Sequence, residues 1–118
     1  MARKTPRLYL EHIQEAIASI ERYVADKTFD DFAADDMLRA AVERRIEIIS
    51  EASRRLPPAM KARYPDLPWP DIASIGNVLR HEYYAIDRDV LWRIATKDLQ
   101  PLAAAVDALL TEVRDRSQ

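Results

Sequence analysis

The stretch that decides the fold is 35–56, which reads DDMLRAAVERRIEIISEASRRL. Its apolar residues recur at helical spacing and would form one stripe along an α-helix. This stripe consists of Leu38, Val42, Ile46, Ile49 and Leu56. Asp35 or Asp36 can cap the first turn, and Pro57-Pro58 ends the helix because proline has no backbone N–H. Further apolar residues widen the stripe, which indicates contact with a second partner, either another helix or another subunit. They are Ala41, Ile48 and Ala52.

A second amphipathic helix is predicted before this stretch, over about 6–26. Thr5-Pro6 is a typical helix start, with a capping residue followed by proline in the first turn. Apolar residues then follow at steps of three and four: Leu10, Ile13, Ile17, Ile20 and Val24. The segment 28–32 between the two helices is predicted to be a short link whose phenylalanines, Phe29 and Phe32, fold back on the core.

Shorter helices are predicted after the proline pair. The segment 59–64 has room for one or two turns, and three prolines within 65–70 make a stiff connector. Asp71 can open a helix that runs to about Tyr83, Asp87 can cap a short helix, and the last helix is predicted to begin at Thr96 or Asp98. The sequence therefore predicts an all-α antiparallel bundle of about five helices, forming one domain over 1–118.

The composition excludes several classes of protein. With 1 Gly in 118 residues, tight-turned sheets, Rossmann loops and P-loops are disfavoured, because they need residues at positive φ. With 0 Cys there is no disulfide framework, thiol nucleophile or cysteine metal site. No apolar run approaches the roughly 20 residues that span a bilayer, and the N-terminus does not resemble a signal peptide. A cytoplasmic protein with no metal site and no cofactor is expected.

The charge pattern leaves the question of nucleic acid open. A net charge of −2 is unlike that of a dedicated nucleic-acid binder, which usually has a basic surplus. Local clusters could still bind one: Arg44-Arg45, Arg54-Arg55, and Lys61 with Arg63. The simpler interpretation, which the frequency of surface charge favours, is that these clusters are solvated helix faces.

Candidate chemistry is concentrated in 75–87, which reads IGNVLRHEYYAID. On a helix, Asn77, Arg80 and His81 can share one broad face, because residues three and four apart are neighbours. Histidine titrates in a range useful for proton transfer, arginine offers a fork of donors to a phosphate, and asparagine can orient either group. Such a set can cleave RNA without a metal. Gly76, four residues before Arg80, would leave space beside them.

The residues alone also fit a simpler interpretation, which they favour. An Arg and a His near a helix C-terminus complement its dipole, Asn77 can be an ordinary surface residue, and Tyr83-Tyr84 can belong to the core. The other histidine, His12, lies beside the apolar stripe of the first helix, where a surface or partly buried role is expected.

The chain resembles the HepT-like family of HEPN-domain proteins over nearly its whole length. The segment 76–83, GNVLRHEY, is similar to the family signature Arg-Asn-x-x-x-His-x-Tyr, with Gly76 in the place of the arginine. The segment 41–52 looks like the pattern Ala-Val-x-Arg-x-Leu-x-Ile-Ile-Gly-Glu-Ala. Further similarities lie in 68–72, 91–94 and 98–102.

The resemblance implies a homodimer with two copies of the motif in one cleft. It also implies a toxin of a toxin–antitoxin system that acts as a metal-independent endoribonuclease. A minimal nucleotidyltransferase would be the antitoxin and would silence the toxin by transferring AMP to a tyrosine. By position, Asn77 and His81 match motif residues and Tyr83 matches the modified tyrosine. Arg80 is the nearby substitute for the arginine missing at Gly76, about one helical turn, roughly 6 Å, away.

Three interpretations follow from the sequence. The first is a toxin ribonuclease that uses Asn77, Arg80 and His81 across a dimer cleft. The second is a catalytically impaired subunit that binds a nucleotidyltransferase and receives AMP on Tyr83. The third is a helical dimerisation scaffold. The loss of the arginine at Gly76 favours the second interpretation, whereas the three retained residues favour the first.

Overall fold

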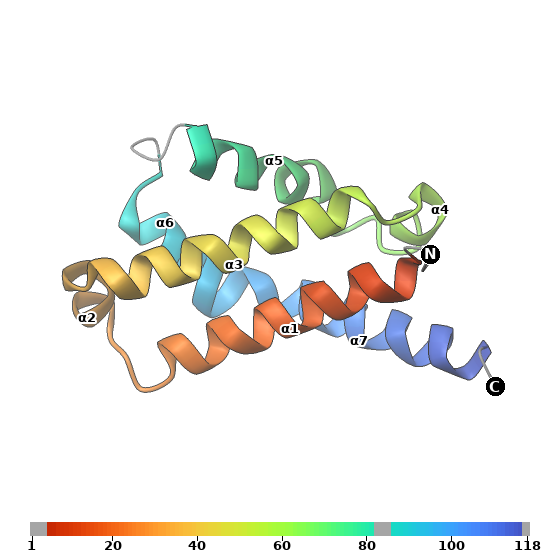
Figure 1. Ribbon diagram of the computed structural model, residues 1–118, viewed down its shortest axis with the longest axis horizontal. Coiled ribbons are helices and arrows are strands. Elements are labelled where there is room, and N and C mark those ends of the chain that lie inside the picture. Colours follow the sequence, from red (N-terminus) through yellow and green to blue (C-terminus); the bar gives the residue numbers. More distant parts are fainter. Residues whose placement is uncertain (1–4, 82–85, 117–118) are drawn as a thin grey trace, which may run out of the picture.

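The computed structural model of the chain describes residues 5–81 and 86–116, and within them every regular element is helical (Figure 1). Two long helices come first, α1 (Pro6–Val24) and α3 (Asp36–Arg54), joined by the short α2 (Phe29–Ala34). The remaining elements are α4 (Pro58–Lys61), α5 (Trp69–His81), α6 (Arg88–Arg93), a π-helical turn (Ile94–Asp98) and α7 (Leu99–Arg116). The predicted all-α class is confirmed.

The core forms where the predicted stripes of α1 and α3 meet. From α1, Leu10, Ile13, Ile17 and Ile20 are buried, and Val24 is half-buried at the end of the stripe. From α3 and the residues after it, Val42, Ile46, Ile49 and Leu56 are buried, whereas Leu38 is half-buried. The helical period of the sequence therefore assigned the inner face of both long helices correctly.

The link between α1 and α3, which was predicted over 28–32 without a secondary structure, contains the helix α2. Thr28 caps α2 in a reciprocal arrangement: its hydroxyl accepts from the Asp31 N–H at 3.1 Å, and the Asp31 carboxylate accepts from the Thr28 N–H at 2.9 Å. The two phenylalanines do fold back, as predicted. Phe32 is fully buried, and both rings pack against Trp92.

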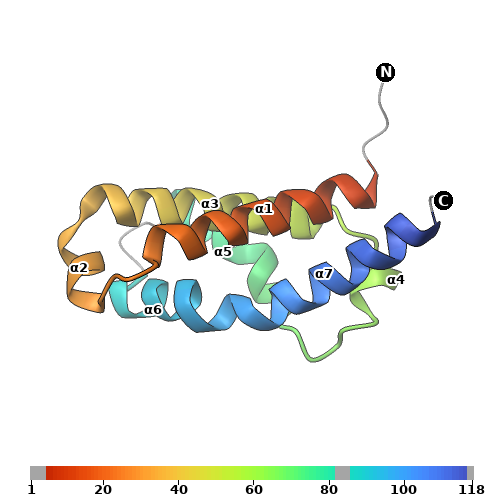
Figure 2. The same ribbon diagram turned by 90° about the horizontal axis from the view of Figure 1, so that it is seen from below.

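The C-terminal third forms one continuous rod from α6 through the π-helical turn into α7 (Figure 2). The last helix, α7, begins at Leu99, one residue after the predicted start at Asp98, but it continues from α6 through the π-helical turn. Pro101 has no N–H to bond four residues back, and the wider π-helical turn ends three residues before it. The Thr96 hydroxyl does not cap a helix but donates to the Trp92 carbonyl at 2.7 Å inside the rod.

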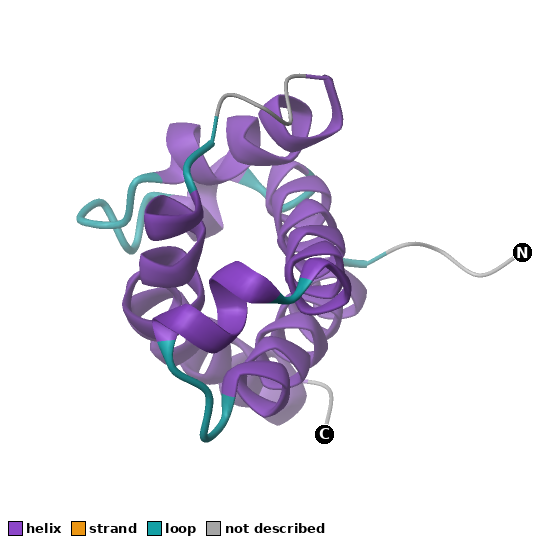
Figure 3. Cartoon of the chain, turned by 90° about the vertical axis from the view of Figure 1, so that its left-hand side faces the viewer, coloured by secondary structure: helices purple, strands orange, loops and turns teal. Residues whose placement is uncertain are grey.

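The bundle is antiparallel and places α3 between α1 and α5. The most extensive packing is α1 on α3 and α3 on α5, and α7 covers the other side of α1 (Figures 1 and 3). Successive long helices reverse direction, so α1 begins and α7 ends at the same end of the bundle (Figure 1). Within the described ranges, no helix has both the length and the apolar character needed to cross a membrane.

Candidate functional site

The candidate residues lie on α5 and its last turn. The helix begins at Trp69, two residues before the predicted Asp71, and the Trp69 indole N–H donates to the Tyr64 carbonyl at 3.0 Å. Asp71 in the first turn and the basic pair Arg80-His81 in the last turn both suit the helix dipole. His81 is the last residue of α5 that the structure describes.

The structure brings the three predicted residues onto the outer arc of α5. Asn77, Arg80 and His81 are all exposed, whereas the neighbouring Gly76 and Leu79 are buried. At 100° per residue, the three exposed positions span roughly a quarter of the helix circumference. The side chains of Asn77 and His81 have no hydrogen-bond or ion-pair partner among the described residues. Their polar atoms are therefore open to an external ligand.

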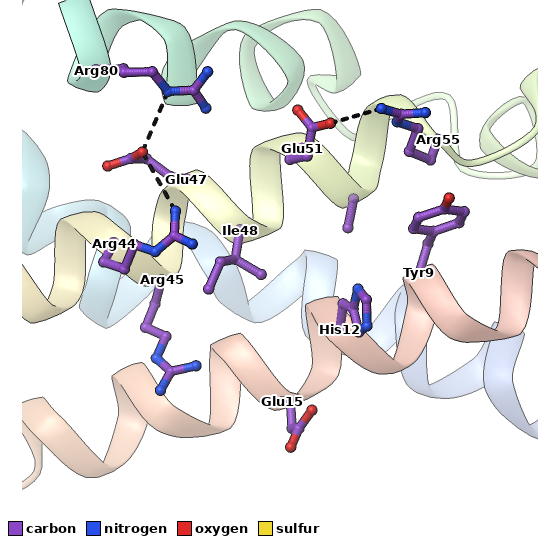
Figure 4. Close-up of a pocket in the computed structure, with 11 residues that line it drawn as sticks. Tyr9, His12, Glu15, Arg44, Arg45, Glu47, Ile48, Glu51, Arg55 and Arg80 are labelled. Atoms are coloured by element: carbon purple, nitrogen blue, oxygen red, sulfur yellow. Dashed lines mark hydrogen bonds and ion pairs between the residues drawn. The ribbon is translucent and has the colours of Figure 1, made fainter. Parts of the chain in front are cut away.

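Arg80 is the member of this set that faces α3. Its Nε lies 3.6 Å from Oε1 of Glu47, and the same oxygen lies 3.8 Å from the guanidinium of Arg44. Figure 4 shows both guanidinium groups reaching the one carboxylate from neighbouring helices. Glu47 thus holds two arginines next to each other at the junction of α3 and α5.

Gly76 leaves no space beside the candidate residues, contrary to the prediction. The Ser50 hydroxyl of α3 donates to the Ala73 carbonyl at 2.8 Å and accepts from the Gly76 N–H at 3.1 Å. A Cβ at position 76 would come within 2.7 Å of both Cβ and Oγ of Ser50. Glycine is needed here because the two helices approach too closely for a side chain.

This contact bears on the arginine that the resemblance places at position 76. An arginine would bring its Cβ into the Ser50 side chain, so it does not fit between α3 and α5 as they stand. The pattern that 41–52 resembles has glycine at the position of Ser50. Ser50 and Gly76, the two positions where the resemblance would place other residues, thus lie face to face.

Tyr83, the predicted AMP acceptor, and Tyr84 lie outside the described residues. Their predicted roles are neither supported nor contradicted by the structure. The described residues contain no group of three His, Cys, Asp or Glu side chains arranged to hold a metal ion.

A groove between α1, α3 and α5 lies beside Arg80 and was not predicted as a unit (Figure 4). Its volume is about 460 Å³. The residues lining it are Tyr9, His12, Glu15, Arg44, Arg45, Glu47, Ile48, Glu51, Ala52, Arg55 and Arg80. The sequence pointed to the arginine pairs as a possible basic cluster, but only the packing of three helices brings them together with Arg80 and the aromatic residues of α1.

Electrostatics within the groove are dominated by shared carboxylates. The Glu51 carboxylate accepts from Arg54 at 2.5 Å and from Arg55 at 3.2 Å, and these hydrogen bonds hold the pKa of Glu51 below its ordinary value. The Arg45 Nε donates to the Tyr23 hydroxyl at 3.3 Å and has no carboxylate partner within the described residues. Two of the three glutamates that line the groove, Glu47 and Glu51, therefore serve two arginines each.

Comparison with known proteins identifies the family. The model of the ribonuclease HepT-like family matches residues 13–109. The chain belongs to the HepT-like family. A HepT-like relative from Thermococcus cleftensis, named "Probable ribonuclease HepT", is 38% identical over 86% of this chain and 92% of its own length. A relative from Caldanaerobacter subterraneus subsp. tengcongensis, named "Putative RNase", is 39% identical over 91% of this chain and 96% of its own length.

One HepT-like relative is longer than this chain. The Methanocaldococcus jannaschii protein named "Gamma-glutamylcyclotransferase and putative RNase" is 38% identical over 94% of this chain, which spans 50% of that protein's length. No solved structure was found to match the chain.

Proposed function

We propose that this HepT-like protein is a metal-independent endoribonuclease and the toxin component of a toxin–antitoxin system. The observation that carries the proposal is the exposed arc of α5 with Asn77, Arg80 and His81. Membership of the family and the names of its relatives give the substrate class, RNA.

The proposed reaction uses the ribose 2′-hydroxyl as nucleophile. A histidine removes the proton of this hydroxyl, the 2′-oxygen bonds to the adjacent phosphorus, and the bond from phosphorus to the 5′-oxygen breaks. An acid gives a proton to the leaving oxygen, so the products are a 2′,3′-cyclic phosphate and a 5′-hydroxyl. Arg80 would offset the negative charge that develops on the phosphate, and Asn77 would orient the phosphate or His81.

A homodimer would supply both the acid and the base. His81 is the only histidine on the exposed arc of α5, and one imidazole does not easily serve both roles in a single step. A two-fold axis near the C-terminal end of α5 would place two copies of Arg80 and His81 in one cleft. Light scattering at micromolar concentration tests this arrangement: a dimer is expected, and a monomer would contradict the composite site.

The proposed antitoxin is a minimal nucleotidyltransferase that transfers AMP to Tyr83. The tyrosine oxygen would attack the α-phosphate of ATP and displace pyrophosphate, which adds a negative charge two residues from His81 and repels RNA. Intact mass and peptide mapping after incubation with the partner and ATP decide this point. AMP on Tyr83 is expected, whereas AMP on Tyr84 or Tyr64, or none on the wild type, would refute the assignment.

The second candidate function is a catalytically impaired subunit that binds the nucleotidyltransferase and is modified by it. The close contact between Gly76 and Ser50 favours it, because that contact keeps an arginine out of position 76. In this alternative, AMP transfer to Tyr83 is retained but RNA is not cleaved.

Product analysis separates the two candidates. Purified protein is incubated with single-stranded RNA in excess EDTA, and with the same RNA carrying 2′-deoxyribose at the cleaved position. A toxin ribonuclease gives cyclic-phosphate ends from the first RNA and no cleavage of the second. Cleavage of both RNAs would contradict the proposed mechanism, and cleavage of neither would favour the impaired subunit.

A further inference from the structure

The groove between α1, α3 and α5 has two ends of different chemistry (Figure 4). We propose that it binds the backbone and one base of single-stranded RNA and leads the strand to Arg80 on α5. This inference rests on the proposed ribonuclease function, because it assigns a substrate track to that site. The groove lies within one subunit, so the track does not depend on the dimer.

The end of the groove where Arg44, Arg45 and Arg80 gather is basic, although the chain as a whole is acidic (Figure 4). The chain has a net charge of −2, yet four arginines and three glutamates line the groove. Two of these glutamates have two arginines each: Glu47 lies near Arg44 and Arg80, and Glu51 bonds to Arg55 and to Arg54 outside the lining. The arginines are therefore only partly neutralised, and a phosphate can bond to donors that remain free.

The second end of the groove is aromatic. Tyr9 and His12 lie one turn apart on α1, with ring centroids 6.2 Å apart and ring planes at 88°. His12 is exposed and Tyr9 is half-buried, so this ring pair is accessible from the groove. Single-stranded nucleic acid is typically bound by a positive groove together with aromatic rings on which bases stack.

The length of the groove suits a short single strand. Arg44 and Arg55 lie eleven residues apart on one helical stretch, which corresponds to about 16 Å at the rise of an α-helix. Arg80 lies at the Arg44 end, and the aromatic pair faces the end at Arg55 (Figure 4). A strand of a few nucleotides can thus contact the arginines and the aromatic rings while reaching the exposed arc of α5.

Glu47 acts as an internal anion in the RNA-free protein. Its carboxylate, 20% exposed, occupies the position between Arg44 and Arg80 where a phosphate would make the same contacts. A phosphate of RNA has to displace the Glu47 carboxylate from the two arginines or share them with it, so removing the charge at Glu47 should strengthen RNA binding. Removing an acidic residue elsewhere on the surface should not strengthen RNA binding.

Fluorescence anisotropy tests the track with a labelled single-stranded RNA of about twelve nucleotides. All proteins carry His81→Ala, so cleavage does not disturb the binding measurement, and EDTA is present. The first variant is Arg44→Ala with Arg45→Ala. Its control is Arg93→Ala with Arg116→Ala, which removes the same number of charges from two exposed arginines outside the groove.

The expected result for the Arg44/Arg45 variant is weaker binding with a reduced salt dependence. The slope of log affinity against log salt should fall by about 1.4, the value for two lost phosphate contacts on a single strand. Glu47→Gln should tighten binding severalfold, whereas Glu21→Gln on a different face of α1 should leave it unchanged.

The aromatic end is tested by His12→Ala, with an expected loss of about fivefold or more. Because Tyr9 also packs against the core, Tyr9→Leu is used in place of Tyr9→Ala, and thermal melts check that each variant is folded. Failure of the proposed function would appear separately, as wild-type protein that binds RNA in the groove but does not cleave it.

The track is overturned by any of three results. One is that the Arg44/Arg45 variant and the Arg93/Arg116 control bind equally well. Another is that Glu47→Gln weakens binding, and the third is that protein with an intact groove does not bind the RNA.

Discussion

Replacing Gly76 by alanine should destabilise the bundle although alanine is the better helix former. The added Cβ would lie 2.7 Å from Cβ and Oγ of Ser50, about 1 Å inside ordinary carbon contact. Overpacking of this kind costs about 1–3 kcal/mol, and disturbing the hydrogen bonds of Ser50 costs about 1 kcal/mol more. Alanine recovers about 1 kcal/mol through helix propensity. The net loss should be about 1–3 kcal/mol, since the two smaller effects offset each other.

Thermal and urea unfolding followed by circular dichroism measure this loss. Gly76→Ala should lower Tm by about 5–15 °C in a domain of this size. Adding Ser50→Gly should restore part of it: the overpacking is relieved, since the next nearest atom to the new Cβ, Cα of Glu47, lies at an acceptable 3.5 Å, but the Ser50 hydrogen bonds stay lost.

Ser53→Gly is the matched control for the rescue. Ser53 is also a buried serine of α3, and its hydroxyl donates to the Ser50 carbonyl at 2.7 Å. The side chain of Ser53 is not among the nearest contacts of a Cβ at position 76. Two results would refute the reasoning: a Gly76→Ala protein as stable as the wild type, or equal rescue by Ser53→Gly and Ser50→Gly.

Two further predictions concern catalysis and acid stability. Arg80→Ala should reduce RNA cleavage by about tenfold or more. The control is Arg93→Ala, which should have little effect although the ion pair of Arg93 has the same 3.6 Å separation. Equal effects of the two substitutions would show that Arg80 is not part of the site. Hydrogen bonds from Thr28 hold the pKa of Asp31 below its ordinary value of 3.8. The ionised Asp31 carboxylate therefore stabilises the folded protein above pH 3.8, and this stabilisation is lost as the pH falls through the lowered pKa. Asp31→Asn should flatten the fall of Tm in this acid range, and an unchanged pH profile would contradict the capping role.

Much of the fold follows from local sequence, because helical periodicity depends on residues close together in the chain. The stripes of α1 and α3 were therefore predicted correctly down to most of their buried residues. The helix α2 was missed although Thr28 and Asp31 have the spacing of a capping box, since two phenylalanines suggested only a return to the core. The continuity of α6 and α7 was missed because Thr96 and Asp98 are typical capping residues when only the sequence is considered.

The candidate site was predictable only in part. The spacing of Asn77, Arg80 and His81 placed them on one helical arc, and the structure agrees. The packing of Gly76 against Ser50, 26 residues earlier in the chain, is a tertiary contact that periodicity does not reveal. The groove likewise depends on three helices, so the arginine pairs of α3 could not be linked to Tyr9 and His12 before the fold was known.

The central claim, RNA cleavage by His81 without a metal, is tested most directly by comparing the wild type with His81→Ala in excess EDTA. The His81 side chain is exposed and contributes little to the core, so His81→Ala should have the same Tm as the wild type. The account predicts cleavage by the wild type in EDTA and a loss of about a hundredfold or more in the variant. Cleavage that needs added magnesium or manganese, or that persists undiminished in His81→Ala, would contradict it.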